Sequence, residues 1–228
     1  MAHSLGLWGG ADAGAEALAA AYERGFTQGD LLTMGIEEEL ILVDPVTFAP
    51  VEAIDFVLGS VRDPRVMVEF RAAQVELVTP IGFTVGALRA ELAAARAAMI
   101  DALGGKVRLL GAGTHPVSTG PAQISDRPRY RQIAAEHPWV LRRGLPSGLH
   151  VHVGFGDADE ALAVYNAARG YLPELAALSS NSPFFEGADA QLASTRLKLV
   201  EDSFSVHVHC VLAQEAATTE VVVMGERL

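Results

Sequence analysis

The chain consists of short apolar runs that alternate with longer stretches in which apolar residues recur at helical spacing. Four to eight apolar or alternating residues are typical of a strand, and a longer 3.6-residue period is typical of a helix. The strand-length runs lie at 36–43, 66–70, 74–78, 107–111 and 149–155, with weaker candidates at 206–212 and 219–224. These runs predict the strands of a sheet.

Two longer segments predict helices. Residues 84–103 are rich in Ala and Leu, contain no proline and end at Gly104–Gly105, a common helix stop. The apolar positions of this helix that should face the sheet are Leu88, Leu92, Ala95 and Met99. Residues 157–178 have a similar pattern, but Pro173 should kink that helix or divide it. Shorter helices are expected at 15–24 and 129–135, the second within a long proline-rich loop at 113–146.

The order of these elements indicates the fold class. Helices separate several of the strands, while other strands are separated by gaps of hairpin length. This arrangement is typical of an α+β domain, in which a mixed or antiparallel sheet is covered by helices on one face.

Composition and charge narrow the class of protein. The 228 residues include 17 Lys+Arg against 28 Asp+Glu, and a net charge of -11 would repel nucleic acid. The single cysteine excludes an internal disulfide framework and favours a reducing compartment. No apolar run approaches the roughly 20 residues that span a bilayer, and the start of the sequence lacks a secretory signal pattern. We therefore expect a soluble, cytoplasmic protein with no nucleic-acid or membrane partner.

Three consecutive glutamates interrupt the first apolar strand. Glu37, Glu38 and Glu39 are unusual there, because glutamate is a poor strand residue and adjacent like charges repel. Side chains alternate across a strand, so Glu37 and Glu39 share one face, with Cα atoms about 7 Å apart, and Glu38 lies on the other. Such a pair can hold hard cations through oxygen ligands. A charged, solvent-exposed edge strand explains the triplet equally well.

Two further glutamates lie in strand-like surroundings. Glu76 shares a face with Gln74 and Val78, and Glu69 precedes Ala72–Ala73, a possible bulge or bend. Beside the first strand, Glu69 and Glu76 would add two carboxylates to the same surface. That surface would need cations, because uncompensated carboxylates packed together have to protonate.

The strand at 149–155 carries two histidines between flanking glycines. His150 and His152 should point to one face of the sheet, where two imidazoles can bind a metal or donate to phosphate and carboxylate oxygens. The residues between and beside them, which should pack into the core on the other face, are Leu149, Val151 and Val153.

The joint occurrence of several motifs in one order resembles the glutamate–cysteine ligase type 2 family, also called carboxylate–amine ligases. The resemblance extends from Met34 to Leu199 and is carried by the ordered set of motifs. These are GIEEEL at 35–40, VELVTP at 75–80, GAGTHP at 111–116, RPRYRQI at 127–133, GLHVHVGF at 148–155, ALSSNSPFFEG at 177–187 and STR at 194–196.

This resemblance implies a glutamine synthetase-like fold, in which a curved antiparallel sheet forms a funnel. Acidic strand residues would hold Mg²⁺ (or Mn²⁺), and ATP and glutamate would meet over them. The γ-carboxylate of glutamate would attack the γ-phosphate of ATP to give an acyl phosphate, which the amino group of an amine such as cysteine would displace. The candidate residues suit this chemistry, because phosphoryl transfer needs cations on the phosphate oxygens and positioned donors.

The resemblance also implies roles for particular residues. The implied metal ligands are Glu37, Glu39, Glu76 and Glu69. The implied catalytic residues are His150 and His152, beside the metal–phosphate site, and Arg196. Arg131 and Arg196 are the candidates for binding the nucleotide or a carboxylate, since guanidinium offers a bidentate fork. An exposed surface position would explain either arginine equally well.

The chain departs from the family pattern in two places. Asp189-Ala190-Gln191 stands where the family usually has Asp-Thr-Gly, so we expect that loop to be built differently. The family also continues well past the Ser-x-Arg motif. We therefore expect a leader at 1–30, a catalytic domain without its C-terminal part at 31–199, and a tail at 200–228. Such a chain should show little or no ligase turnover, and homodimerisation could cover an exposed sheet edge.

Two other functions remain open from the residues alone. A metal-dependent hydrolase could place the His150/His152 pair and the second pair, His207 and His209, around zinc, which favours imidazole nitrogen. The glutamate-rich strands favour Mg²⁺ over zinc. The third possibility is a non-catalytic remnant of the ligase fold.

Overall fold

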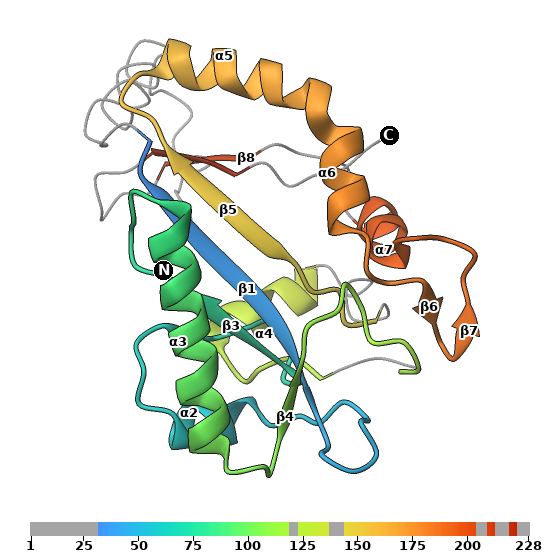
Figure 1. Cartoon of the computed structure of the whole chain (residues 1–228). Coiled ribbons are helices and arrows are strands. Elements are labelled where there is room, and N and C mark those ends of the chain that lie inside the picture. The colour runs from blue at the N-terminus through green and yellow to red at the C-terminus, as the bar shows by residue number, and fades with distance from the viewer. Residues whose placement is uncertain (1–31, 119–122, 137–143, 204–208, 213–218, 223–228) are drawn as a thin grey trace.

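The computed structural model describes residues 32–118, 123–136, 144–203, 209–212 and 219–222. The helix expected at 15–24 and His207 lie outside these residues. At the centre is a seven-stranded sheet in the order β2-β3-β1-β5-β9-β8, with β4 also pairing with β1 (Figure 1). The strands are β1 (Met34–Val43), β2 (Val66–Val68), β3 (Gln74–Val78), β4 (Arg108–Leu110), β5 (Leu149–Gly154), β8 (His209–Leu212) and β9 (Thr219–Val222).

Every strand pair in this sheet is antiparallel, which decides between the two sheet types that the sequence allowed. One edge of β1 pairs with β3, and the opposite edge pairs first with β5 and then with β4. The register places Glu39 opposite Glu76 and Glu37 opposite His150. Because directly opposed residues lie on the same face of a sheet, these four side chains share one face.

The helices are α2 (Ile54–Ser60), α3 (Val85–Leu103), α4 (Pro128–Glu136), α5 (Ala158–Ala168), α6 (Leu172–Ser179) and α7 (Thr195–Ser203). A one-turn 3₁₀ helix (Arg169–Tyr171) joins α5 to α6, and a small hairpin is formed by β6 (Phe184–Phe185) and β7 (Ala188–Asp189). No helix within the described residues is both long and apolar enough to cross a bilayer.

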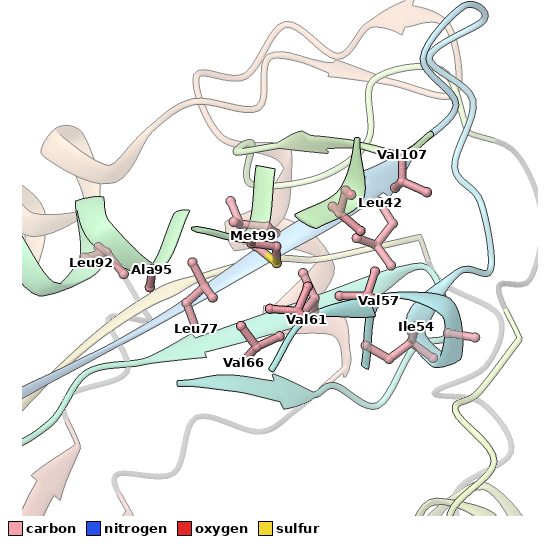
Figure 2. Close-up of a cluster of buried hydrophobic side chains, with 14 residues drawn as sticks. Leu42, Ile54, Val57, Val61, Val66, Leu77, Leu92, Ala95, Met99 and Val107 are labelled. Atoms are coloured by element: carbon pink, nitrogen blue, oxygen red, sulfur yellow. The ribbon is translucent and has the colours of Figure 1, made fainter. Parts of the chain in front are cut away.

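The main hydrophobic core lies between the sheet and the helices α2 and α3 (Figure 2). From β1 it takes Leu40 and Leu42, which alternate with the residues of the glutamate face. The remaining buried residues of this core are Ile54, Val57, Val61, Val66, Ala72, Val75, Leu77, Leu92, Ala95, Met99, Leu103 and Val107. The opposite face carries the charged residues of β1, β3 and β5 and, towards the end of β1, a smaller core of Ile41, Val43, Ala73 and Leu145.

Helix α3 forms as the sequence predicts. Its predicted sheet-facing residues, Leu88, Leu92, Ala95 and Met99, are all buried. The Thr84 side chain caps the first turn by accepting a hydrogen bond from the Ala87 backbone N–H. The chain leaves the helix at Gly104, whose φ of 56° lies in the left-handed region that glycine adopts without a steric penalty.

Thr84→Ala is expected to lower the free energy of unfolding by about 1 kcal/mol, because a first-turn N–H loses its side-chain acceptor. Urea unfolding followed by circular dichroism measures this change. Val85→Ala is the matched control, since Val85 begins the helix, is 69% exposed and makes no cap. Equal losses from the two substitutions would show that the cap contributes nothing.

Several expectations from the sequence need correction. The fold has helices on both faces, because α4 lies behind the sheet in Figure 1 while α3 lies in front of it. The short helix α2 was not predicted, since seven residues carry too little periodicity. Of the bulge or bend predicted at Ala72–Ala73, the structure shows the bend, as a turn between β2 and β3. The predicted division of the helix at 157–178 is confirmed, with Pro173 near the start of α6 where its missing N–H is tolerated.

The apolar residues of β5 were also placed wrongly. Leu149 is 55% exposed and Val151 is 47% exposed, although both were expected in the core. The strand alternates as predicted, but α3 packs mainly over β1, β3 and β4. Only Val153 is partly covered, against Phe155 and the α5 residue Ala161.

Candidate active site

One face of the sheet carries five of the predicted site residues from three adjacent strands. Glu37 and Glu39 come from β1, Glu76 from β3, and His150 and His152 from β5. Ligand atoms of Glu37, His150 and His152 all lie within 4.8 Å of one another, and so do those of Glu39, Glu76 and His150. The structure therefore brings these residues together as the alternation of each strand predicts.

Glu37 lies between the two imidazoles. Its Oε2 is 3.2 Å from Nδ1 of His150 and 3.2 Å from Nε2 of His152. Hydrogen bonds from His150 and His152 hold the pKa of Glu37 down to about 2, against the opposing effect of burial. Glu37 is therefore an ionised carboxylate with an imidazole nitrogen on each side.

Glu39 is fixed by the chain segment just before β5. The Gly148 N–H donates to Glu39 Oε2 at 2.7 Å, and the Glu39 N–H donates to the Gly148 carbonyl at 2.9 Å. Burial raises the pKa of Glu39, while His150, the Gly148 N–H and Arg196 act to lower it. The backbone of Gly148 thus orients this carboxylate, and the nearby positive charges do not outweigh the effect of burial on its pKa.

Glu69 and Glu76 complete a group of mutually repelling carboxylates. Glu69 follows β2, and its Oε1 accepts from the Phe70 N–H at 2.5 Å. Burial, and then the charge of Glu39, raise the pKa of Glu69 to about 7. Burial, and then the charge of Glu69, raise the pKa of Glu76 to about 8. A dication among these oxygens would reverse both shifts, because it favours the ionised form.

Glu38 has a separate, structural role. It lies on the opposite face of β1, where Arg96 of α3 pairs with its carboxylate through both Nε and Nη2. This bidentate pair joins the helix to the sheet and raises the pKa of Arg96. The middle glutamate of the triplet therefore takes no part in the site.

Arg196 lies next to Gly148 and His150. A methyl group on Gly148 would lie 2.7 Å from Arg196 Nη2 and 3.1 Å from His150 Nε2, so the guanidinium sits beside both the glycine and the imidazole. The Arg196 N–H donates to Ser182 Oγ at the start of α7. Its Nε is buried without a hydrogen-bond partner among the described residues. This arrangement suits an arginine that receives an anionic group at the carboxylate cluster.

Arg131 lies elsewhere. Its guanidinium pairs with Asp126 on an exposed part of α4, and its side chain is 55% exposed. Arg131 makes no hydrogen bond to the carboxylate cluster in the described part of the chain, and its binding role stays a prediction.

The sequence reasoning missed three residues that shape the site. Tyr130 of α4 donates to the Val68 carbonyl, and its pKa is raised to about 12 by burial and then by the charges of Glu69 and Glu76. Asn181 accepts from the Gly113 N–H through Oδ1, which joins the loop after β4 to the loop after α6. Gly148 itself is the third. All three lie within the family motifs, so only the resemblance could have identified them.

The second histidine pair is only partly described. His209 of β8 is paired with Val222, which is paired in turn with His152. At 4.7–4.9 Å per strand, the Cα atoms of His209 and His152 are therefore about 9.5 Å apart across the sheet.

The donor set fits the ion that the resemblance implies. Ligand atoms of Glu39, Glu76 and His150 lie within 4.8 Å of one another, and carboxylate oxygens are the ligands that Mg²⁺ and Mn²⁺ prefer. Glu69 adds a third carboxylate nearby, whose charge raises the pKa of Glu76. Burial of several carboxylates is costly unless a cation compensates them. The residues therefore fit a hard divalent cation at this position.

Comparison with known proteins places the chain in a family. The profile of "Glutamate-cysteine ligase family 2(GCS2)" matches residues 33–210. A protein of Saccharopolyspora erythraea, provisionally named glutamate–cysteine ligase 2-1, is 38% identical over 170 residues, which cover 74% of this chain and 46% of the relative. A Rubrobacter xylanophilus protein, provisionally named glutamate–cysteine ligase 2-3, is 39% identical over 173 residues, covering 73% and 48%. The chain thus spans about half the length of these relatives.

A solved structure supports the fold. The crystal structure of a bifunctional glutathione synthetase from Pasteurella multocida superposes with a TM-score of 0.51 at 14% sequence identity, covering 90% of this chain and 36% of that one. Identity this low speaks for the fold alone. The match to the family profile and the sequence relatives decide the family, and the chain belongs to glutamate–cysteine ligase family 2.

Proposed function

We propose that this chain carries the metal-binding and phosphoryl-transfer part of an ATP-dependent carboxylate–amine ligase, which joins glutamate to an amine such as cysteine through an acyl phosphate. The observation that carries the proposal is the group of three half-buried carboxylates, Glu39, Glu69 and Glu76, which repel one another, with Arg196 near Glu39. Phosphoryl transfer needs this combination of cation ligands and a cationic donor more than it needs covalent help.

Each residue has a separate role in this proposal. Glu39, Glu69 and Glu76, with Glu37 at the edge, hold Mg²⁺ or Mn²⁺, which supplies neutralisation of phosphate charge when bound. Arg196 receives the transferred phosphoryl group or a substrate carboxylate as a bidentate donor. His150 keeps Glu37 ionised and oriented through a hydrogen bond at 3.2 Å, and Nε2 of His152 lies 3.2 Å from the same oxygen. Gly148 orients Glu39 from the other side.

Substrates and surroundings follow from the family. The names of the relatives support glutamate and cysteine as substrates. ATP is the proposed co-substrate, because the acyl phosphate of the proposed reaction needs a phosphoryl donor. We further propose that the sheet belongs to a glutamine synthetase-like funnel, and that the protein is cytoplasmic, as its single cysteine suggests.

A coupled ADP-release assay with Mg²⁺, ATP, glutamate and cysteine tests the proposed reaction. Because the chain spans 46% of the Saccharopolyspora relative, the assay uses both the chain and a chimera in which residues 33–199 replace the matching segment of that relative. Glutamate-dependent turnover by the chimera, lost on Glu39→Gln and kept on Glu52→Gln at an exposed position, is the expected result. A chimera that binds Mg²⁺ and folds but releases no ADP would contradict the proposal.

A further inference from the structure

Gln74 is a buried polar residue on the strand that carries Glu76. It lies two residues before Glu76, on the same face of β3, and is paired with Ile41 of β1. Gln74 is only 2% exposed, and a buried amide is costly unless its polar atoms find hydrogen-bond partners. The partners of this side chain therefore indicate its role.

Both partners belong to the segment that leads into β5. Gln74 Nε2 donates to the Pro146 carbonyl at 2.7 Å and to Ser147 Oγ at 2.7 Å. Because a carbonyl oxygen can only accept, the amide nitrogen has to face this segment, and both of its hydrogens are used. Asparagine is one methylene shorter, and an ionised glutamate cannot donate. The contact therefore requires a glutamine.

The same segment orients the Glu39 carboxylate. Ser147 is 4% exposed, and its N–H donates to the Gly113 carbonyl at 2.9 Å. The next residue, Gly148, donates its N–H to Glu39 Oε2 at 2.7 Å and accepts from the Glu39 N–H at 2.9 Å. A displacement of Ser147 therefore moves the backbone N–H that holds this carboxylate.

Apolar packing alone does not fix that peptide. Leu145 anchors the start of the segment in the smaller core, together with Ile41, Val43 and Ala73. This contact holds the chain in place, but the hydrophobic effect has no direction and does not determine how the following peptides are turned. Hydrogen bonds are directional, so the two bonds from Gln74 supply the orientation that the core contact lacks.

We infer that Gln74 is a positioning residue for the carboxylate cluster, and that its two hydrogen bonds keep the Gly148 N–H directed at Glu39. The same glycine lies beside Arg196, so a cation ligand and the cationic donor both depend on one buried side chain of β3. The inference rests on the proposed function for its effect on Mg²⁺. The hydrogen bonding of Gly148 itself is independent of any bound ion.

Gln74→Met in the intact chain tests the inference. Methionine is a flexible side chain of similar length that fits apolar surroundings and has no N–H to donate. Without added metal, the Gly148 amide should exchange with deuterium about 10-fold faster than in the parent chain, because two hydrogen bonds that hold the peptide are lost. The Leu42 amide, which donates to the Ala73 carbonyl, should keep its rate. NMR-detected hydrogen exchange measures both.

Calorimetry with Mg²⁺ alone measures the effect on the site. Gln74→Met should bind Mg²⁺ about 10-fold more weakly, since loss of a group that orients a metal ligand from outside typically costs 10–100-fold in affinity. Val57→Ala is the matched control, because Val57 is fully buried in the main core and should cost stability without changing Mg²⁺ affinity. A purely structural role for Gln74 would make the two variants alike.

Ser147→Ala provides a second variant if Gln74→Met does not fold. It removes one of the two partners of Gln74, so Gly148 exchange and Mg²⁺ affinity should change in the same direction by a smaller factor. Unchanged Gly148 exchange, equal acceleration of the Gly148 and Leu42 amides, or faster exchange with unchanged Mg²⁺ affinity would overturn the inference. A parent chain that binds no Mg²⁺ would contradict the proposed function, and the exchange rates would still decide the role of Gln74.

Discussion

Saturating Mg²⁺ is expected to raise the melting temperature of the chain by about 5–10 °C, and to raise it more at about pH 8 than at about pH 6. A ligand at 100 times its Kd stabilises the folded state by about 2.7 kcal/mol, and 1 kcal/mol shifts the melting temperature by about 2–4 °C in a chain of this size. The pH dependence arises because Mg²⁺ binds ionised carboxylates. Differential scanning fluorimetry with and without Mg²⁺ measures both effects.

The metal-free protein should show the opposite trend with pH. The pKa values of Glu69 and Glu76 are raised to about 7 and about 8, above the 4.5 of an exposed glutamate. Between those values the folded state binds more protons than the unfolded state, so stability is lost as the pH rises through this window. Glu37, with its pKa lowered to about 2, acts only below about pH 4.5 and does not disturb the window. Glu76→Gln should flatten the decline and stabilise the metal-free protein near pH 8.

The triple variant Glu37→Gln, Glu39→Gln and Glu76→Gln should lose the Mg²⁺ response. Its matched control removes three charges at exposed positions, Glu52, Glu136 and Glu174, and should keep the response. This comparison separates loss of ligands from the general change in net charge. An unchanged Mg²⁺ shift in the first variant would exclude these carboxylates as the metal site.

The face of the site could be predicted from the sequence because the period of a strand is two. Glu37 and Glu39 had to share a face once β1 was recognised, and the same rule oriented His150 and His152. Register between strands could not be predicted, since it depends on loop geometry and packing over the whole domain. The direct opposition of Glu39 and Glu76 is therefore information that only the structure supplies.

Burial was harder to predict than orientation. Leu149 and Val151 alternate with the histidines as a core-facing pair would, yet no helix covers them within the described residues. Alternation fixes which face a side chain takes, but the area of sheet that a helix covers depends on where its connections place the helix.

The structural role of Glu38 could not be predicted either. Its partner Arg96 lies 58 residues away on α3, and the sequence does not show where that helix packs on the sheet.

Gly148→Ala is expected to reduce glutamate-dependent ADP release by the chimera on the order of 100-fold while leaving the Mg²⁺-induced rise in melting temperature intact. The added methyl group would lie 2.7 Å from Arg196 Nη2 and 3.1 Å from His150 Nε2. The arginine has to move, and displacement of a binding group by about 1 Å can cost about 100-fold in rate. The backbone hydrogen bond from residue 148 to Glu39 survives the substitution, so the cation ligands keep their places.

A second glycine of the same site makes the control. A methyl group on Gly35 would meet only His152 Cβ at 3.9 Å, an ordinary contact, although Gly35 is paired with His152 in the neighbouring strand. Gly35→Ala should therefore leave ADP release within a few-fold of the parent chimera. Arg196→Lys keeps the positive charge but removes the bidentate guanidinium. This variant should therefore lose ADP release to a similar extent as Gly148→Ala, whereas Gly35→Ala should not. Full ADP release by the Gly148→Ala chimera would mean that the position of Arg196 beside residue 148 is not needed. That result would remove the arginine from the proposed mechanism.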